Sequence, residues 1–97
     1  MPISRAHVPT ASAARYMTQL CKHWSHRLEV DYNDTTGRIA FDAERSCILH
    51  ALADGLEIEA VAADEEQLAR TQETVVTHLK RFAFREDIGD VSWRRLE

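Results

Sequence analysis

The sequence has few of the features that mark specialised classes of protein. It contains two cysteines, Cys21 and Cys47, too few for a disulfide scaffold, and we expect both to be buried thiols in a reducing compartment. Three glycines and two prolines leave no low-complexity tract. No apolar run approaches the roughly 18 residues of a membrane-spanning helix, and the N-terminus lacks the apolar core of a secretory signal. We therefore expect one soluble cytoplasmic domain over residues 1–97, without a membrane partner.

An excess of positive charge is also missing. Twelve Lys and Arg residues against sixteen Asp and Glu residues give a formal net charge of −4. Non-specific binding to DNA comes almost entirely from basic side chains on the phosphates, so a net acidic chain disfavours it. We expect no nucleic-acid partner.

The common catalytic signatures are absent too. The chain has no G-x-S-x-G, no glycine-rich phosphate loop and no H-E-x-x-H. The carboxylates of Glu57 and Glu59 are expected to hydrate a sheet surface rather than to act as an acid and base. We predict no catalytic residue and no cofactor, and we favour a binding domain over an enzyme.

Two helices are predicted from the spacing of apolar residues. The first spans about 11–27, with Thr10 and Ser12 as candidate N-caps. Its inward stripe comprises Ala13, Met17, Leu20, Cys21 and Trp24. The second begins at Asp64–Glu66 and has bases near its end, which suits the helix dipole at both ends. Its inward stripe comprises Leu68, Gln72, Val75, Val76, Leu79, Phe82 and Ala83.

The remaining segments predict strands. Residues 3–8 suit an edge strand because Pro9 follows them. Residues 28–32, 38–42, 47–52 and 56–61 form a meander with breaks at 33–37, 43–46 and 53–55, and we expect Gly37 to supply a positive φ in the first break. Residues 91–95 close the chain as a last strand. The apolar residues expected on the covered face of the meander are Leu28, Val30, Tyr32, Ile39, Phe41, Leu56, Ile58 and Ala60, and those expected on its wet face are Glu29, Asp31, Arg38, Asp42, Glu57 and Glu59.

The order β-α-β-β-β-β-α-β predicts an α+β fold. Two amphipathic helices and one antiparallel sheet bury their apolar faces together as a two-layer sandwich, with both helices on the same face.

Five histidines are the one compositional excess. Cys21, His23 and His26 form C-x-H-x-x-H late in the first helix, a spacing typical of metal ligands. The helical wheel separates them, however, since Cys21 faces the core and His26 faces water. We therefore predict no metal site here. His7 and His50 have no acid at an orienting spacing, so we expect no functional role for either.

His23 and His78 lie on same-sense shoulders of their two helices. If the helices are antiparallel and these shoulders face inward, the two histidines line one groove. Tyr16 and Arg85 lie on the same shoulders, so we predict a ligand-binding groove from His23, His78, Tyr16 and Arg85. The alternative is two hydrogen-bonded histidines at a helix contact that binds nothing.

Residues 78–86 mix bases with aromatics, a composition that suits an acidic ligand. We predict a small positive patch for an anionic partner, made by Lys80, Arg81, Arg94 and Arg95 with Arg85 nearby. The alternative is a helix end whose bases complement the dipole, with Phe84 packed under the closing strand.

Two strings resemble a known family. Leu20-Cys21-Lys22-His23-Trp24-Ser25-His26 and His78-Leu79-Lys80-Arg81-Phe82-Ala83-Phe84-Arg85-Glu86, followed by Trp93-Arg94, resemble a small bacterial domain family of unknown function. The resemblance covers nearly the whole chain. It implies a fold like half of a TATA-box-binding protein, but no DNA binding, because function lives in the site and this sheet face is acidic. Members occur alone or joined to siderophore-interacting flavoprotein reductases, which implies a link to iron and siderophore handling, and no site residues are established to carry over.

The leading interpretation is a binding or accessory domain with a small-molecule or protein partner in siderophore or iron metabolism. One alternative is a histidine-based metal protein or enzyme. The other is a homo-oligomeric interaction module that pairs through an exposed strand or sheet face.

Overall fold

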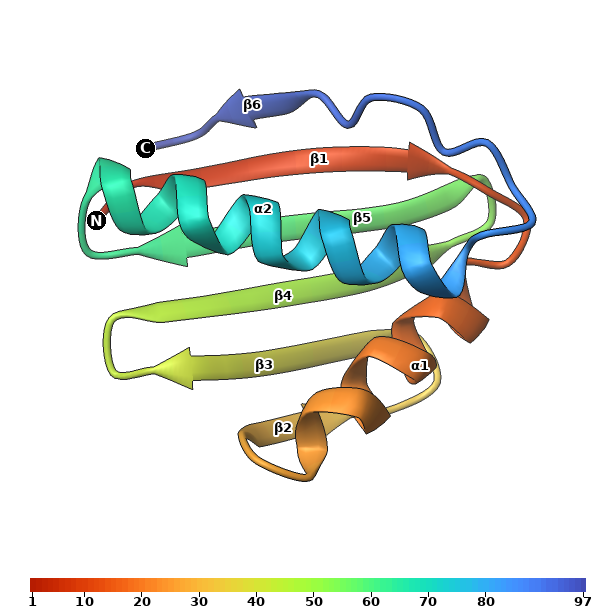
Figure 1. Ribbon diagram of the computed structural model, residues 1–97, viewed down its shortest axis with the longest axis horizontal. Helices are drawn as coiled ribbons and strands as arrows, with labels where there is room; N and C mark the ends of the chain where they lie inside the picture. Colours follow the sequence, from red (N-terminus) through yellow and green to blue (C-terminus); the bar gives the residue numbers. More distant parts are fainter.

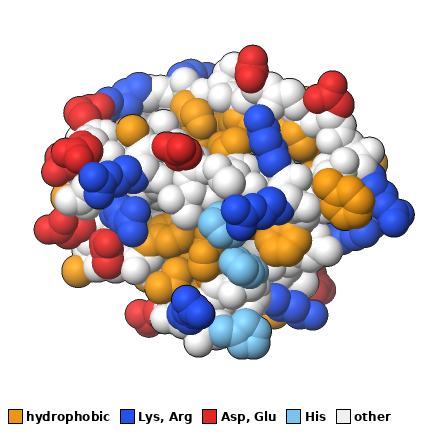
Figure 2. Space-filling model, viewed as in Figure 1, with side chains coloured by type: hydrophobic (Ala, Val, Ile, Leu, Met, Phe, Trp, Pro, Cys, Tyr) orange, Lys and Arg blue, Asp and Glu red, His pale blue; other side chains and the backbone are white.

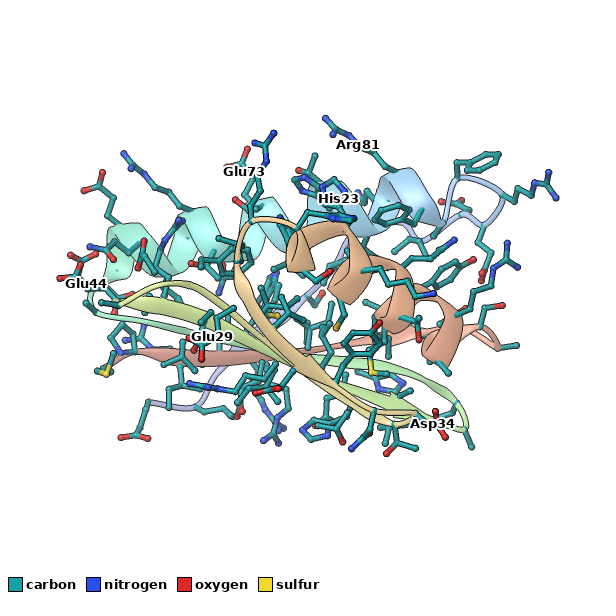
Figure 3. The ribbon with its side chains drawn as sticks, turned by 90° about the horizontal axis from the view of Figure 1, so that it is seen from below. His23, Glu29, Asp34, Glu44, Glu73 and Arg81 are labelled. Atoms are coloured by element: carbon teal, nitrogen blue, oxygen red, sulfur yellow. The ribbon has the colours of Figure 1, made fainter.

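The computed structural model describes every residue from Met1 to Glu97 and shows two layers, a sheet and a pair of helices on one of its faces (Figures 1 and 3). The elements in chain order are β1 (Ile3–Pro9), α1 (Ala13–Ser25), β2 (Glu29–Tyr32), β3 (Thr36–Asp42), β4 (Arg45–Leu52), β5 (Gly55–Ala62), α2 (Glu65–Phe82) and β6 (Trp93–Arg95). This order and the shared face of the two helices confirm the predicted α+β sandwich. Neither helix is long and apolar enough to cross a membrane.

The sheet has six antiparallel strands in the order β2-β3-β4-β5-β1-β6. Strands β2 to β5 form the predicted meander. The prediction that β1 is an edge strand is wrong, because β1 pairs with both β5 and β6 (Figure 1). Its residues Ser4, Ala6 and Val8 are buried, as in a central strand. Pro9 is tolerated because it is the last residue of β1 in the pairing with β5.

The helices begin at different kinds of cap. Asp64 caps α2 in the expected way, since its Oδ1 accepts a hydrogen bond from the Gln67 backbone N–H at 2.8 Å. Ser12 is the N-cap residue of α1, but its side chain makes no capping bond. Thr10 Oγ1 instead accepts from the Ser12 N–H at 3.0 Å. Helix α1 spans Ala13–Ser25, so it is shorter at both ends than the predicted 11–27.

Gly37 has a different role from the one predicted. It lies inside β3 without a positive φ, and the preceding turn is held by Asn33, whose Oδ1 accepts from the Thr35 and Thr36 N–H groups, each at 2.9 Å. A Cβ on Gly37 would lie 2.6 Å from Cys21 Sγ. The glycine is thus required by the close approach of α1 to the sheet rather than by a turn.

The core lies between the helices and the sheet. Its largest fully buried side chains include Met17, Leu20, Val75, Leu79, Ile39, Leu49, Leu56 and Ile58. Both cysteines are buried as predicted, and burial raises the pKa of the Cys21 thiol to about 11. Two aromatic predictions are wrong. Tyr32 is 42% exposed at the end of edge strand β2, and Phe84 is 74% exposed because β6 begins only at Trp93 and leaves it uncovered.

Candidate functional site

His23 and His78 come together where the C-terminal part of α1 meets α2. His23 lies in the last turn of α1, and His78 lies one turn before the end of α2. Their ring centroids are 5.1 Å apart and their planes are tilted by 43°. The helical wheels placed both residues on the shoulders of their helices, and the structure brings these shoulders into contact.

Three further aromatic side chains surround the histidine pair. The Trp24 ring lies 4.8 Å from His78 and 5.1 Å from Phe41, centroid to centroid, and Phe82 lies 5.8 Å from His23. We call these five residues the ring cluster. The sequence assigned Trp24, Phe41 and Phe82 to the core alone, and only the packing of α1 against β3 and α2 reveals that they also border the histidines.

One ring nitrogen of His78 is fixed by its own helix. Nδ1 lies 2.7 Å from the backbone carbonyl oxygen of Thr74. Because a carbonyl oxygen can only accept, Nδ1 carries the proton and donates it, which leaves Nε2 as the acceptor in the neutral ring. The two histidines are therefore not joined through this nitrogen, and Nε2 remains for another partner.

An open hollow of about 570 Å³ lies beside the histidine pair. Its lining residues are His23, Trp24, His26, Arg27, Leu28 and His78, and we call it the histidine hollow. Its volume falls within the roughly 300–1,000 Å³ of small-molecule sites. Figure 2 shows histidine side chains gathered on this face of the molecule, next to Lys or Arg and hydrophobic side chains. No carboxylate lines the hollow.

The surroundings of His23 are positive. Several effects lower the pKa of His23, and the largest is its partial loss of contact with water beside neighbouring side chains. The nearby His78 and Arg81 lower this pKa further, and His26 and Arg27 have smaller effects in the same direction. His23 and Arg81 lie on the same outer side of the helix layer (Figure 3). The hollow is thus an electropositive site with a neutral imidazole at its centre at pH 7.

The structure does not bring Tyr16 and Arg85 to this site. Tyr16 is buried about two turns before His23 on α1, and its hydroxyl donates a hydrogen bond to Glu86. Arg85 lies beyond the end of α2 and is exposed, with its guanidinium 5.5 Å from the centre of the Phe84 ring. The wheel position of Arg85 has no meaning after the helix ends at Phe82, so this part of the predicted groove is wrong.

The predicted basic patch is also not formed. Arg95 pairs with Glu65 at the start of α2, where its Nη1 donates to Oε1 at 2.6 Å. Lys80 and Arg81 lie near the other end of this helix, about 22–24 Å along its axis from Glu65. Arg94 lies opposite Arg5 on the neighbouring strand. Of the four bases, only Arg81 lies near the histidine hollow.

The structure offers no cluster of metal ligands. No group of three or more His, Cys, Asp or Glu side chains is placed to hold a metal ion. Sequence reasoning did miss one relationship, because the strand register places Glu57 opposite both His7 and His50. This row belongs to an ion-pairing surface, where Arg5 lies 3.4 Å from Glu57 and 3.2 Å from Glu59. It depends on the registers of the β1–β5 and β4–β5 pairings, which no pattern within one segment predicts.

Comparison with known proteins identifies the family. A model described as an uncharacterized protein conserved in bacteria, DUF2218, matches residues 5–94. The NMR structure of PA4090 from Pseudomonas aeruginosa is 39% identical in sequence, over 97% of this chain and 96% of that chain, with a TM-score of 0.82. No curated protein matches. The match to the family model spans nearly the whole chain, and the protein therefore belongs to the DUF2218 family of bacterial proteins.

Proposed function

We propose that this protein is a small binding domain whose histidine hollow holds a small-molecule ligand. The observation that supports this most directly is the meeting of His23 and His78, from two different helices, at 5.1 Å beside a hollow of about 570 Å³. The two imidazoles, one from each helix, thus border the same open volume.

The composition of the hollow supports a binding role. Small-molecule sites are largely apolar or aromatic, with a few polar groups that fix orientation. Trp24 and Leu28 supply apolar surface, while His23, His26 and Arg27 supply exposed polar groups. Trp24 is only 9% exposed, so its position is set by the core and it offers a rigid wall.

We further propose that the domain serves siderophore or iron handling, as an accessory to a small-molecule or protein partner. The support is the resemblance stated above, in which related domains are joined to siderophore-interacting flavoprotein reductases. An electropositive hollow is chemically suited to an anionic chelate. The alternative is self-association through an edge of the sheet, where β2 and β6 are the outermost strands.

Titration with ferric siderophores and with flavins, followed by tryptophan fluorescence, tests this function. Trp93→Phe removes the second tryptophan, so the remaining signal reports Trp24 beside the hollow. We expect saturable quenching that is lost in His23→Gln/His78→Gln. The matched control is His7→Gln/His50→Gln, on the opposite face of the sheet, which should bind like the parent protein. Absence of binding by calorimetry for every ligand, or unchanged binding in the hollow variant, would overturn the proposal.

A further inference from the structure

We infer that the histidine hollow recognises a planar aromatic anion, a ring that bears a carboxylate or a comparable acidic oxygen. This inference rests on the proposed function, since it specifies the chemical class of the ligand for the same site. It is drawn from the rings and the charges that surround the hollow.

The ring cluster favours an aromatic ligand. Its contacts are tilted or edge-on, with interplanar angles of 43° for His23 and His78, 49° for Trp24 and His78, and 71° for His23 and Phe82. No pair in the cluster is stacked in parallel, and the T-shaped pairs place the edge of one ring against the face of the other. Aromatic rings prefer offset-stacked or edge-to-face neighbours at centroid distances of 4.5–7 Å, and a planar ring in the hollow could add such a contact.

The ionisable groups around His23 favour an anion. Helix α1 contributes His23, and the segment directly after it contributes His26 and Arg27. Helix α2 contributes His78 and Arg81. The ring cluster adds only the uncharged Phe41 from β3. No element contributes a carboxylate to the lining of the hollow.

The two arginines at this site differ from several others in the protein. Arg5, Arg45, Arg70 and Arg95 are each paired with a Glu or Asp side chain. Neither Arg27 nor Arg81 forms such a pair. An unpaired guanidinium retains the planar fork of donors that binds a carboxylate through two parallel hydrogen bonds.

The histidines add a second way to recognise the charge. A bound anion next to His23 favours the protonated imidazolium, so binding of the ligand should raise the pKa of this ring. Because Nδ1 of His78 donates to Thr74, Nε2 of His78 is the nitrogen left to contact the ligand. Proton uptake on binding thus provides a readout that apolar packing alone would not produce.

Three matched probes test the ligand class in an NMR titration of the full chain. Benzoate is planar, aromatic and anionic; benzamide removes the charge, and cyclohexanecarboxylate removes the aromatic ring. We expect benzoate to shift the amide signals of residues 23–28 and 74–82. It should bind at least about tenfold more tightly than benzamide, as a charge-assisted hydrogen bond implies, and about two- to tenfold more tightly than cyclohexanecarboxylate, as a ring contact implies. The His23 imidazole should titrate at higher pH in the benzoate complex.

Two variants separate this inference from the function on which it rests. Arg27→Gln/Arg81→Gln should weaken benzoate binding to the level of benzamide, while the control Arg85→Gln should bind benzoate like the parent chain. Equal binding of all three probes at the hollow, or benzoate binding that ignores the Arg27/Arg81 substitutions, overturns the aromatic-anion class and leaves the hollow as a binding site. If no probe, ferric siderophore or flavin shifts these signals, both the inference and the proposed function fail.

Discussion

The Tyr16 hydroxyl donates a hydrogen bond to the carboxylate of Glu86, 70 residues later in the chain. Thr10 donates to the same carboxylate, with oxygen–oxygen distances of 2.9 and 3.1 Å. Glu86 therefore ties the segment after α2 to the start of α1. This junction holds the start of α1 near the end of α2, and it explains why Tyr16 is unavailable to the ligand site.

Removal of the Tyr16 hydroxyl should weaken this junction. We expect Tyr16→Phe to lower the free energy of unfolding by about 1–2 kcal/mol, because a hydrogen bond to a charged group is lost and the carboxylate keeps only Thr10. Urea unfolding at pH 7 measures the change. Tyr32→Phe is the matched control, since Tyr32 is 42% exposed and forms no such link. A Tyr16→Phe protein as stable as the Tyr32→Phe protein would show that the junction adds no stability.

The buried thiols predict loss of stability in alkali. Burial raises the pKa of Cys21 from 9.0 to about 11, and burial also raises the pKa of Cys47. The unfolded chain therefore releases these protons first, so stability present below pH 9 is lost as the pH rises through about 11. Urea unfolding at several pH values from 8 to 11 should show this decline, with a smaller slope in Cys21→Ala. A slope unchanged by the substitution would assign the decline to other groups.

Gly37 tests the close approach of α1 to the sheet. Gly37→Ala places a Cβ 2.6 Å from Cys21 Sγ, and we expect a loss of about 1–3 kcal/mol from overpacking. Cys21→Ala removes the sulfur atom, so the double variant Gly37→Ala/Cys21→Ala should lose less than the sum of the two single changes. Thermal or urea unfolding of the four proteins measures the coupling. Strict additivity would contradict the contact.

The His23 ring should titrate below the ordinary value of 6.5, since partial loss of water contact and the nearby cationic groups favour its neutral form. His78→Gln removes one of those groups and should move the midpoint back toward 6.5. Because folding lowers the pKa of His23, this ring contributes to the free energy of unfolding above pH 6.5. That contribution is lost as the pH falls through the lowered pKa. Imidazole NMR signals followed from pH 5 to 8 measure the midpoint. His50→Gln, on the other sheet face, should leave it unchanged.

Local spacing was enough to predict most of the fold, and pairing between distant segments explains the errors. The helix at 65–82 and the four-stranded meander follow from apolar periods within a few residues. The position of β1 depends on β6, which joins the sheet almost at the other end of the chain. An apolar segment that ends in a proline is compatible with an edge strand and also with a central strand that ends at the proline, so the local sequence does not distinguish the two.

The site shows the same limit. The contact of His23 with His78 was predictable because both residues lie on helices whose wheels are regular. Arg85 was misplaced because its position depends on where α2 ends, and Tyr16 because its hydroxyl is bound by Glu86 from an irregular segment. The Glu57 row between His7 and His50 depends on strand register, which no single segment encodes.

Paramagnetic broadening by a bound ferric siderophore tests the central claim most directly, because it locates the ligand without reliance on substitutions. The gallium complex of the same siderophore serves as the diamagnetic reference. We predict that signal loss in the ferric complex centres on residues 23–28 and 74–82, around His23 and His78. Broadening centred on the opposite sheet face near His7 and His50, or spread evenly over the chain, would contradict the account.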